Sequence, residues 1–114
     1  MPTLSKFRGG VLLFGGLFFV AFAGQILSNL VAMNSDTFAK DKLNGQKVGE
    51  VDMDKLNTKG GSLAVGHPFG ATGSRLVTTA SRRLQQENQQ FALVAACADG
   101  GTGHACLLER YDNK

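Results

Sequence analysis

Apolar residues in the second half of the chain recur first at helical spacing and then at strand spacing. A helix is predicted from just after Gly73 to about Asn88, because its apolar residues repeat every three or four positions and fall on one face. That face carries Leu76, Val77, Ala80 and Leu84, and the opposite face carries Arg75, Thr79, Arg82, Arg83 and Gln86. We therefore expect the first set to pack on a core and the second to face solvent.

Two strands are predicted after this helix. Residues 91–96 form an apolar run of the kind that is buried on both faces of a sheet, and residues 105–108 form a second run. The glycine-rich segment 99–103 separates them, and such a short connection favours adjacent antiparallel strands. Helix, strand, turn and strand together indicate an α/β layer.

The first half of the chain predicts two helices followed by a surface loop. The first helix begins near Ala23, and its spacing is typical of a soluble helix that packs on a core. Its apolar face carries Ile26, Leu27, Leu30 and Val31. Ser35 and Asp36 are candidate caps of a short second helix that reaches Lys42, and the composition of residues 43–59 indicates a loop.

The opening of the chain is apolar. Residues Gly9 to Gly24 carry no charge and follow two basic residues, as in a secretory signal or a membrane anchor. Ala21 and Ala23 add the small-x-small pattern that signal peptidases prefer. Against this interpretation, Gly15 and Gly16 interrupt the run, and each costs a helix about 1 kcal/mol relative to alanine. A targeting segment with membrane contact through Gly9 to Gly24 and a segment of a soluble domain both stay open.

Length and composition narrow the class of protein. A chain of 114 residues has room for one domain, and 43% hydrophobic with 18% charged residues indicates a globular protein rather than a disordered or polytopic membrane protein. The net charge of +3 is spread without a basic stripe, so no nucleic-acid partner is predicted. The two cysteines, Cys97 and Cys106, are too few for a disulfide framework and favour a reducing compartment.

Glycine is concentrated in two windows. Eight of the fifteen glycines lie in residues 60–73 and 100–103. In the first window His67 stands between Gly66 and Pro68, and a residue before proline is driven to extended geometry. We therefore expect its ring in a loop just before a helix start, where N–H groups favour a negatively charged ligand. The alternative is a surface histidine with local hydrogen bonds only.

The second window follows Cys97, which lies at the C-terminal end of a predicted strand. α/β proteins place reactive groups at such ends, because the strand holds the side chain while the loop admits a ligand. The alternative is a buried thiol that acts as a small hydrophobe, and Cys106 fits that alternative better. No metal is predicted, because the spacings of His67, Cys97, His104 and Cys106 match no zinc site. Too few residues follow Gly103 for a dinucleotide-binding unit, and no phosphate loop occurs.

The two windows, GGSLAVGHPFGATGSRL and ALVAACADGGTGHACLLE, together resemble the C-terminal domain of thiolases (acetyl-CoA acyltransferases). The likeness is greatest to the β subunits of fatty acid oxidation trifunctional complexes. It covers about residues 21–113 and includes AFAGQILSNL, DTFAKDKL and VGEVDMDKLN. The resemblance implies the C-terminal half of the thiolase fold, a layered αβαβα arrangement in which two similar domains pack together.

The resemblance also implies a chemistry, the reversible cleavage of a 3-ketoacyl-CoA by coenzyme A. His67 would assist a nucleophilic cysteine of the first domain, and Cys97 would move a proton at the α-carbon or at the incoming thiol. The imidazole would also help to hold the thioester oxygen, and backbone N–H groups of Asp99 and Gly100 would face the second oxyanion. Coenzyme A is then a substrate, and no cofactor is bound permanently. The implied partners are an acyl-CoA and an N-terminal thiolase domain or homologous subunit, in the mitochondrion or, for a bacterial protein, the cytoplasm.

The sequence departs from the family pattern at several points. Asp99 stands where the family usually has a small neutral residue, and Phe19-Val20 stands where it has a His-Glu or Asn-Glu pair. Nothing in the sequence corresponds to the nucleophile domain, which occupies about 300 upstream residues in the two-domain proteins of the family. We therefore expect residues 1–20 to be an unrelated apolar segment before a thiolase C-terminal domain at residues 21–114, and this chain to be inactive alone.

Two alternatives come from other classes. In the first alternative the chain is a non-enzymatic binding or assembly module derived from a thiolase. In the second it is a membrane-anchored or exported fragment that uses Gly9 to Gly24.

Overall fold

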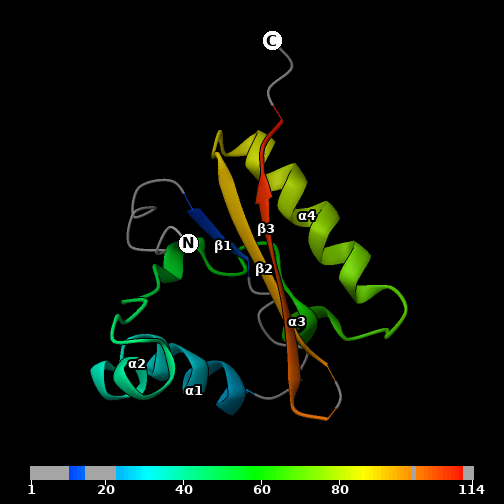
Figure 1. Cartoon of the computed structure of the whole chain (residues 1–114). Helices are drawn as coiled ribbons and strands as arrows, with labels where there is room; N and C mark the ends of the chain where they lie inside the picture. The colour runs from blue at the N-terminus through cyan, green and yellow to red at the C-terminus, as the bar shows by residue number, and fades with distance from the viewer. Residues whose placement is uncertain (1–10, 15–22, 99, 112–114) are drawn as a thin grey trace.

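The computed structural model describes residues 11–14, 23–98 and 100–111, which form a small mixed sheet with helices around it (Figure 1). The elements in chain order are β1 (Val11–Phe14), α1 (Ala23–Met33), α2 (Asp36–Lys42), the 3₁₀ turn η2 (Met53–Lys55), α3 (Ser62–Val65), α4 (Thr72–Gln86), β2 (Phe91–Ala98) and β3 (Thr102–Glu109). The sheet has the order β1-β2-β3, with β1 parallel and β3 antiparallel to the central strand. The described residues thus confirm an α/β arrangement.

The antiparallel pair of β2 and β3 confirms the predicted hairpin. Its register runs from Phe91 opposite Glu109 to Ala98 opposite Thr102. Both strands extend further toward the turn than the sequence indicates, because the connection is only residues 99–101. Gly100 and Gly101 have φ angles of 80° and 76°, and glycine adopts this left-handed region without a steric penalty. Gly100 and Gly101 therefore serve the turn itself, whereas Gly103 lies in β3.

The apolar opening of the chain contributes a strand. Val11–Phe14 pairs in parallel with β2, with Val11 opposite Phe91. An unrelated segment before the domain is therefore not confirmed, since part of it shares backbone hydrogen bonds with the central strand. In the described ranges no helix has both the length and the apolar character that a membrane span needs. The rest of the proposed anchor, residues 9–10 and 15–22, lies outside these ranges.

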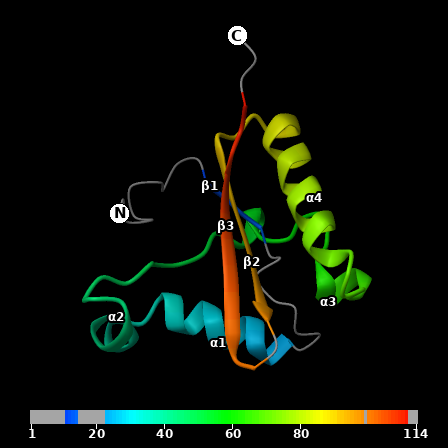
Figure 2. The ribbon, with the colours of Figure 1, turned by 45° about the vertical axis from the view of Figure 1, so that its right-hand side comes forward.

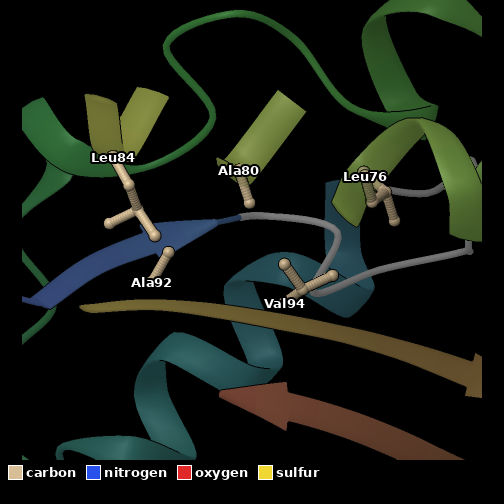
Figure 3. Packing of buried hydrophobic residues seen from close by; sticks show 5 residues of the cluster. All are labelled: Leu76, Ala80, Leu84, Ala92 and Val94. Carbon is tan, nitrogen blue, oxygen red and sulfur yellow. The ribbon is translucent and has the colours of Figure 1, made fainter. Parts of the chain in front are cut away.

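The core lies between α4 and the central strand. Leu76, Ala80 and Leu84 of α4 face Ala92 and Val94 of β2 (Figure 3). Leu108 of β3 packs against this cluster. Alternate residues of a strand point to opposite faces. The intervening Phe91, Leu93 and Ala95 are only half-buried. The prediction that β2 is buried on both faces is thus met on the α4 face alone.

The predicted faces of α4 are wrong for two residues. Val77 was expected in the core and is 40% exposed, whereas Arg83 was expected in solvent and is 1% exposed. The Arg83 guanidinium donates through Nε and Nη2 to the Glu87 carboxylate, the latter at 2.9 Å, and through Nη1 to the Lys55 carbonyl at 3.3 Å. Arginine can be buried because these partners satisfy its donors. Arg83 therefore lies on the buried side of α4 together with Leu84, and its hydrogen bond to the Lys55 carbonyl joins α4 to η2.

The first two helices form a separate pair. The predicted N-cap of α2 is confirmed, since the Ser35 hydroxyl oxygen accepts a hydrogen bond from the Phe38 N–H at 3.2 Å. In both views the pair lies near the end of the sheet where β2 stops (Figures 1 and 2). The predicted packing of α1 on a core is not found, because α1 has no buried residue among those described. Leu27 and Val31 are 61% and 70% exposed.

Candidate functional site

The fold brings the two glycine windows to the same end of the sheet. α4 packs on β2 and leads into it through only residues 87–90, so helix and strand run in opposite directions. Their lengths also match, because 15 helical residues span about 22 Å and 8 strand residues about 26 Å. The start of α4 therefore lies level with the C-terminal end of β2. Both views show α3 and the start of α4 near the β2–β3 turn (Figures 1 and 2).

His67 lies in the connection between α3 and α4, as predicted. Its Nδ1 is 2.7 Å from Oγ1 of Thr72, the first residue of α4. Its ring also packs against the Phe69 ring, with a centroid distance of 4.9 Å and a tilt of 50°. The ring is half-buried, so one part is held by the loop and another part is accessible. A histidine in this position can exchange a proton with a group that approaches from outside.

The backbone around His67 is fixed on both sides. The Gly66 carbonyl accepts a hydrogen bond from Arg75 Nη2 at 2.9 Å. The Pro68 carbonyl accepts from the N–H groups of Ala71 and Thr72, both at 3.0 Å. Gly66 has φ 89° and ψ 172°, a conformation that only glycine adopts readily. These contacts hold the histidine in one place relative to the start of α4.

Two further glycines of this window have no such conformational reason. At Gly70 and Gly73 φ is not in the left-handed region, and a Cβ atom would meet nothing within 4 Å. Neither strain nor crowding among the described residues therefore requires glycine there. That a ligand or partner approaches this stretch of backbone stays a prediction. The lack of another reason for glycine at Gly70 and Gly73 favours it.

The second window is described only in part. Cys97 lies in β2 with its backbone opposite Gly103, but its side chain is outside the described part of the structure, as is the whole of Asp99. Gly100 begins the turn to β3. The convergence of His67 and Cys97 and the oxyanion contact of residues 99 and 100 thus stay predictions. The topology brings the segments that carry them to one end of the molecule.

Cys106 is in a different place from Cys97. It lies within β3 opposite Val94, and it is half-buried rather than enclosed. Its Sγ is 3.9 Å from the Leu107 carbonyl oxygen. Across the described ranges, no three His, Cys, Asp or Glu side chains are grouped as metal ligands.

Sequence reasoning did not single out Thr72. Its side chain is 0% exposed, although threonine is polar, and it links His67 to the start of α4. The signal was present, because Thr72 follows the histidine by five residues and stands where the helical pattern begins. A small hydroxyl residue at a helix start often bonds nearby groups of the preceding loop.

Comparison with known proteins gives a consistent result. The family model described as "Thiolase, C-terminal domain" matches residues 18–110. The chain is 56% identical over 92 residues to a probable 3-ketoacyl-CoA thiolase of Caenorhabditis elegans, which covers 80% of this chain and 20% of the relative. It is 56% identical over 95 residues to the mitochondrial trifunctional enzyme subunit beta of Bos taurus, covering 82% and 20%. It is 52% identical over 90 residues to a 3-ketoacyl-CoA thiolase of Photobacterium profundum, covering 78% and 21%.

The matches cover most of this chain but only a small part of each relative. The chain spans about one fifth of the length of the relatives that it matches. The matched residues include both glycine windows and the elements that place them, namely α3, α4, β2 and β3. This chain therefore belongs to the thiolase family, and its residues 18–110 correspond to the C-terminal thiolase domain.

Proposed function

We propose that this chain supplies the proton-transferring residues of an acyl-CoA acyltransferase of the 3-ketoacyl-CoA thiolase class, acting in fatty acid oxidation. The observation that carries the proposal is the anchored position of His67, at the end of the sheet where the strand bearing Cys97 terminates. The names of the relatives give the reaction class, since they include 3-ketoacyl-CoA thiolases and trifunctional enzyme β subunits. The acyl-CoA and coenzyme A are substrates in this proposal.

The proposed reaction has two halves, and this chain's residues move the protons in both. His67 takes the proton of a nucleophilic cysteine thiol, whose sulfur attacks the 3-keto carbon while N–H groups of residues 99 and 100 stabilise the oxyanion. The bond between the α- and β-carbons then breaks, and the Cys97 thiol gives its proton to the α-carbon of the departing acetyl-CoA. In the second half the Cys97 thiolate takes the proton of an incoming coenzyme A, whose sulfur accepts the acyl group. The released cysteine thiolate then takes back the proton that His67 holds.

The nucleophile is assigned to thiolase sequence outside these 114 residues. The chain has two cysteines, of which Cys97 is assigned the acid–base role and Cys106 lies within β3. We therefore expect the chain alone not to cleave acetoacetyl-CoA or a longer 3-ketoacyl-CoA. Turnover by the isolated chain that is abolished by Cys97→Ala would overturn this assignment.

A graft tests the proposed roles directly. Residues 21–111 replace the matching segment of the Photobacterium thiolase, and thiolysis of a 3-ketoacyl-CoA is followed by loss of its absorbance. We expect activity in the graft, and a loss of about 100- to 10,000-fold in kcat for His67→Ala and for Cys97→Ala, the range for removing a general acid or base. Cys106→Ala is the matched control and should keep the activity of the graft. Full activity of the folded Cys97→Ala graft would refute the proposal.

A second candidate function is supported by the exposed face of α1. Leu27 and Val31 are large apolar side chains in solvent, and such surfaces mark contact sites. In this alternative the chain is a non-enzymatic assembly module that binds a thiolase domain or subunit. It predicts binding to a thiolase subunit that persists in the His67→Ala variant, measured by co-purification of the two purified proteins. A chain that binds no thiolase subunit but completes the active graft would exclude it.

We propose a mitochondrial location on the names of the trifunctional enzyme relatives. Fractionation of cells that express the full chain with a C-terminal tag tests this location. Recovery with matrix proteins supports it, and recovery with carbonate-resistant membranes would instead favour an anchor within residues 9–24.

A further inference from the structure

The buried hydroxyl of Thr72 lies between a carbonyl oxygen and the imidazole of His67. Oγ1 is 3.0 Å from the Pro68 carbonyl oxygen and 2.7 Å from His67 Nδ1. The side chain is 0% exposed, and it stands at the first position of α4, which continues for 15 residues. The contact to Nδ1 is thus held by an element that is itself packed on the sheet.

The protons of these three groups can be assigned in one consistent way. A carbonyl oxygen only accepts, so the Thr72 hydroxyl is the donor in its 3.0 Å hydrogen bond to the Pro68 oxygen. A hydroxyl has one proton, and once that proton points to Pro68, Oγ1 can only accept from His67. Nδ1 must then carry a proton. In the opposite assignment the hydroxyl would turn toward Nδ1, and the Pro68 carbonyl would keep only the N–H groups of Ala71 and Thr72 as donors.

This assignment decides which ring nitrogen of His67 acts as the base. In a neutral imidazole one nitrogen is a donor and the other carries the lone pair. With the proton on Nδ1, the lone pair is on Nε2. A histidine side chain in water favours the other tautomer, so the Thr72 hydroxyl reverses the ordinary preference.

We propose that Thr72 is a positioning residue that holds His67 in the Nδ1–H tautomer and directs Nε2 toward the reacting thiol. The statement on the tautomer rests on the geometry of this chain alone, whereas the statement on the thiol rests on the proposed function. For histidines that ligate a metal, removal of the group that holds the second ring nitrogen costs about 10- to 100-fold in activity or affinity, and we expect an effect of that size here. Thr72 itself touches no substrate in this proposal.

The tautomer is measured in the 114-residue chain without any activity. Long-range ¹H–¹⁵N correlation spectra of the ¹⁵N-labelled chain, at an alkaline pH where histidines are neutral, identify the protonated nitrogen of each ring. We expect His67 to be protonated on Nδ1, and His104, which is exposed on β3, to show the tautomer favoured in water. A wild-type spectrum with the His67 proton on Nε2 overturns the proposal, whether or not any variant folds.

Variants then assign the effect to the hydroxyl. Thr72→Val keeps the shape of the side chain but removes Oγ1, and we expect the His67 tautomer to shift toward that of His104. Thr72→Ser keeps the hydroxyl and should keep the wild-type tautomer, while Thr78→Val on the exposed face of α4 is the matched control. A Thr72→Val chain that folds, as judged by its circular dichroism, and keeps the Nδ1–H tautomer would refute the role of the hydroxyl.

The graft separates this proposal from the proposed function. In an active graft, Thr72→Val should lower kcat by about 10- to 100-fold with little change in KM, and Thr72→Ser should restore it. An inactive graft whose His67 still shows the Nδ1–H tautomer contradicts the proposed function and leaves the tautomer assignment standing. An active graft whose kcat is the same with valine at position 72 contradicts the positioning role and leaves the proposed function standing.

Discussion

α4 and α1 are helices with similar apolar patterns but different surroundings. α4 buries Leu76, Ala80 and Leu84 against the sheet, together with the side chains of Thr72 and Arg83. α1 buries no residue among those described, and its Leu27 and Val31 face solvent. The pattern predicts that a helix forms and which side is apolar, but the element that covers that side decides how much it stabilises the fold. The site depends on the covered helix, because α4 provides Thr72 and holds the end of the histidine loop.

The largest effect is expected from removing a core side chain of α4. Leu84 is 2% exposed and packs in the cluster with Ala92. Leu84→Ala should therefore lower the free energy of unfolding by about 2 to 5 kcal/mol, the usual cost of such a cavity. Leu27→Ala on α1 should change it by less than about 0.5 kcal/mol, because that side chain is already exposed. Urea unfolding followed by circular dichroism measures both, and equal losses in the two variants would contradict the comparison.

The next effect comes from the ion pair that α4 carries at its C-terminal end. The Arg83 guanidinium is buried, so Glu87→Gln removes the charge that compensates it and leaves a neutral amide in its place. We expect a loss of about 1 to 3 kcal/mol, toward the lower end because the Glu87 side chain is about a third exposed. Glu50→Gln, at an exposed position outside the helices, is the control and should have little effect. A loss no larger than that of the control would show that the burial of Arg83 does not depend on the charge of Glu87.

The same pair predicts a dependence on pH. The hydrogen bond from Arg83 lowers the pKa of Glu87 below its ordinary 4.5, its partial burial acts in the opposite direction, and the charges of Arg83 and Lys59 lower it further. A carboxyl with a lowered pKa in the folded state stabilises the fold at a pH above its unfolded value, and this contribution is lost as the pH falls through the folded value. The difference in stability between wild type and Glu87→Gln should thus be constant near neutral pH and shrink below about 4.5. A difference that grew on acidification would reverse the assigned sign.

Local signals explain which parts of this structure could be predicted from the sequence. The Ser35 cap, the β2–β3 hairpin and the histidine loop before α4 each depend on a few neighbouring residues, and each was predicted. The burial of Arg83 could not be predicted, because it depends on the Lys55 carbonyl, which is 28 residues away in the chain. The pairing of Val11–Phe14 with β2 is also long-range, and an apolar run alone is equally typical of a strand and a signal segment.

A smaller effect is expected from the helix pair outside the α4 core. Ser35 accepts the Phe38 N–H at the start of α2, and removal of such a cap costs about 1 kcal/mol. Ser35→Ala should therefore lower the free energy of unfolding by about this amount. Ser28→Ala is the matched control, because the Ser28 hydroxyl bonds the Gly24 carbonyl within α1, a contact that adds little to a helix. Hydrogen exchange should locate the loss of protection in α2 for Ser35→Ala, and a loss spread equally over α4 would contradict the separation of the two regions.

The smallest effect on the isolated chain is expected at the exposed face of α1, and it sharpens the comparison most. Val31→Lys adds a charge where the side chain is 70% exposed, so the free energy of unfolding of the isolated chain should change by less than about 0.5 kcal/mol. In the grafted thiolase the same substitution should lower the melting temperature by several degrees if another part of the protein covers α1, because a lysine would then be buried without a partner. Gln25→Lys, also on α1 and exposed, is the control in both settings. If Val31→Lys is silent in the graft as well, the face of α1 is exposed there too and the proposed contact is wrong. If it destabilises only the graft, α1 has the same kind of apolar face as α4, and only its covering surface lies outside this chain.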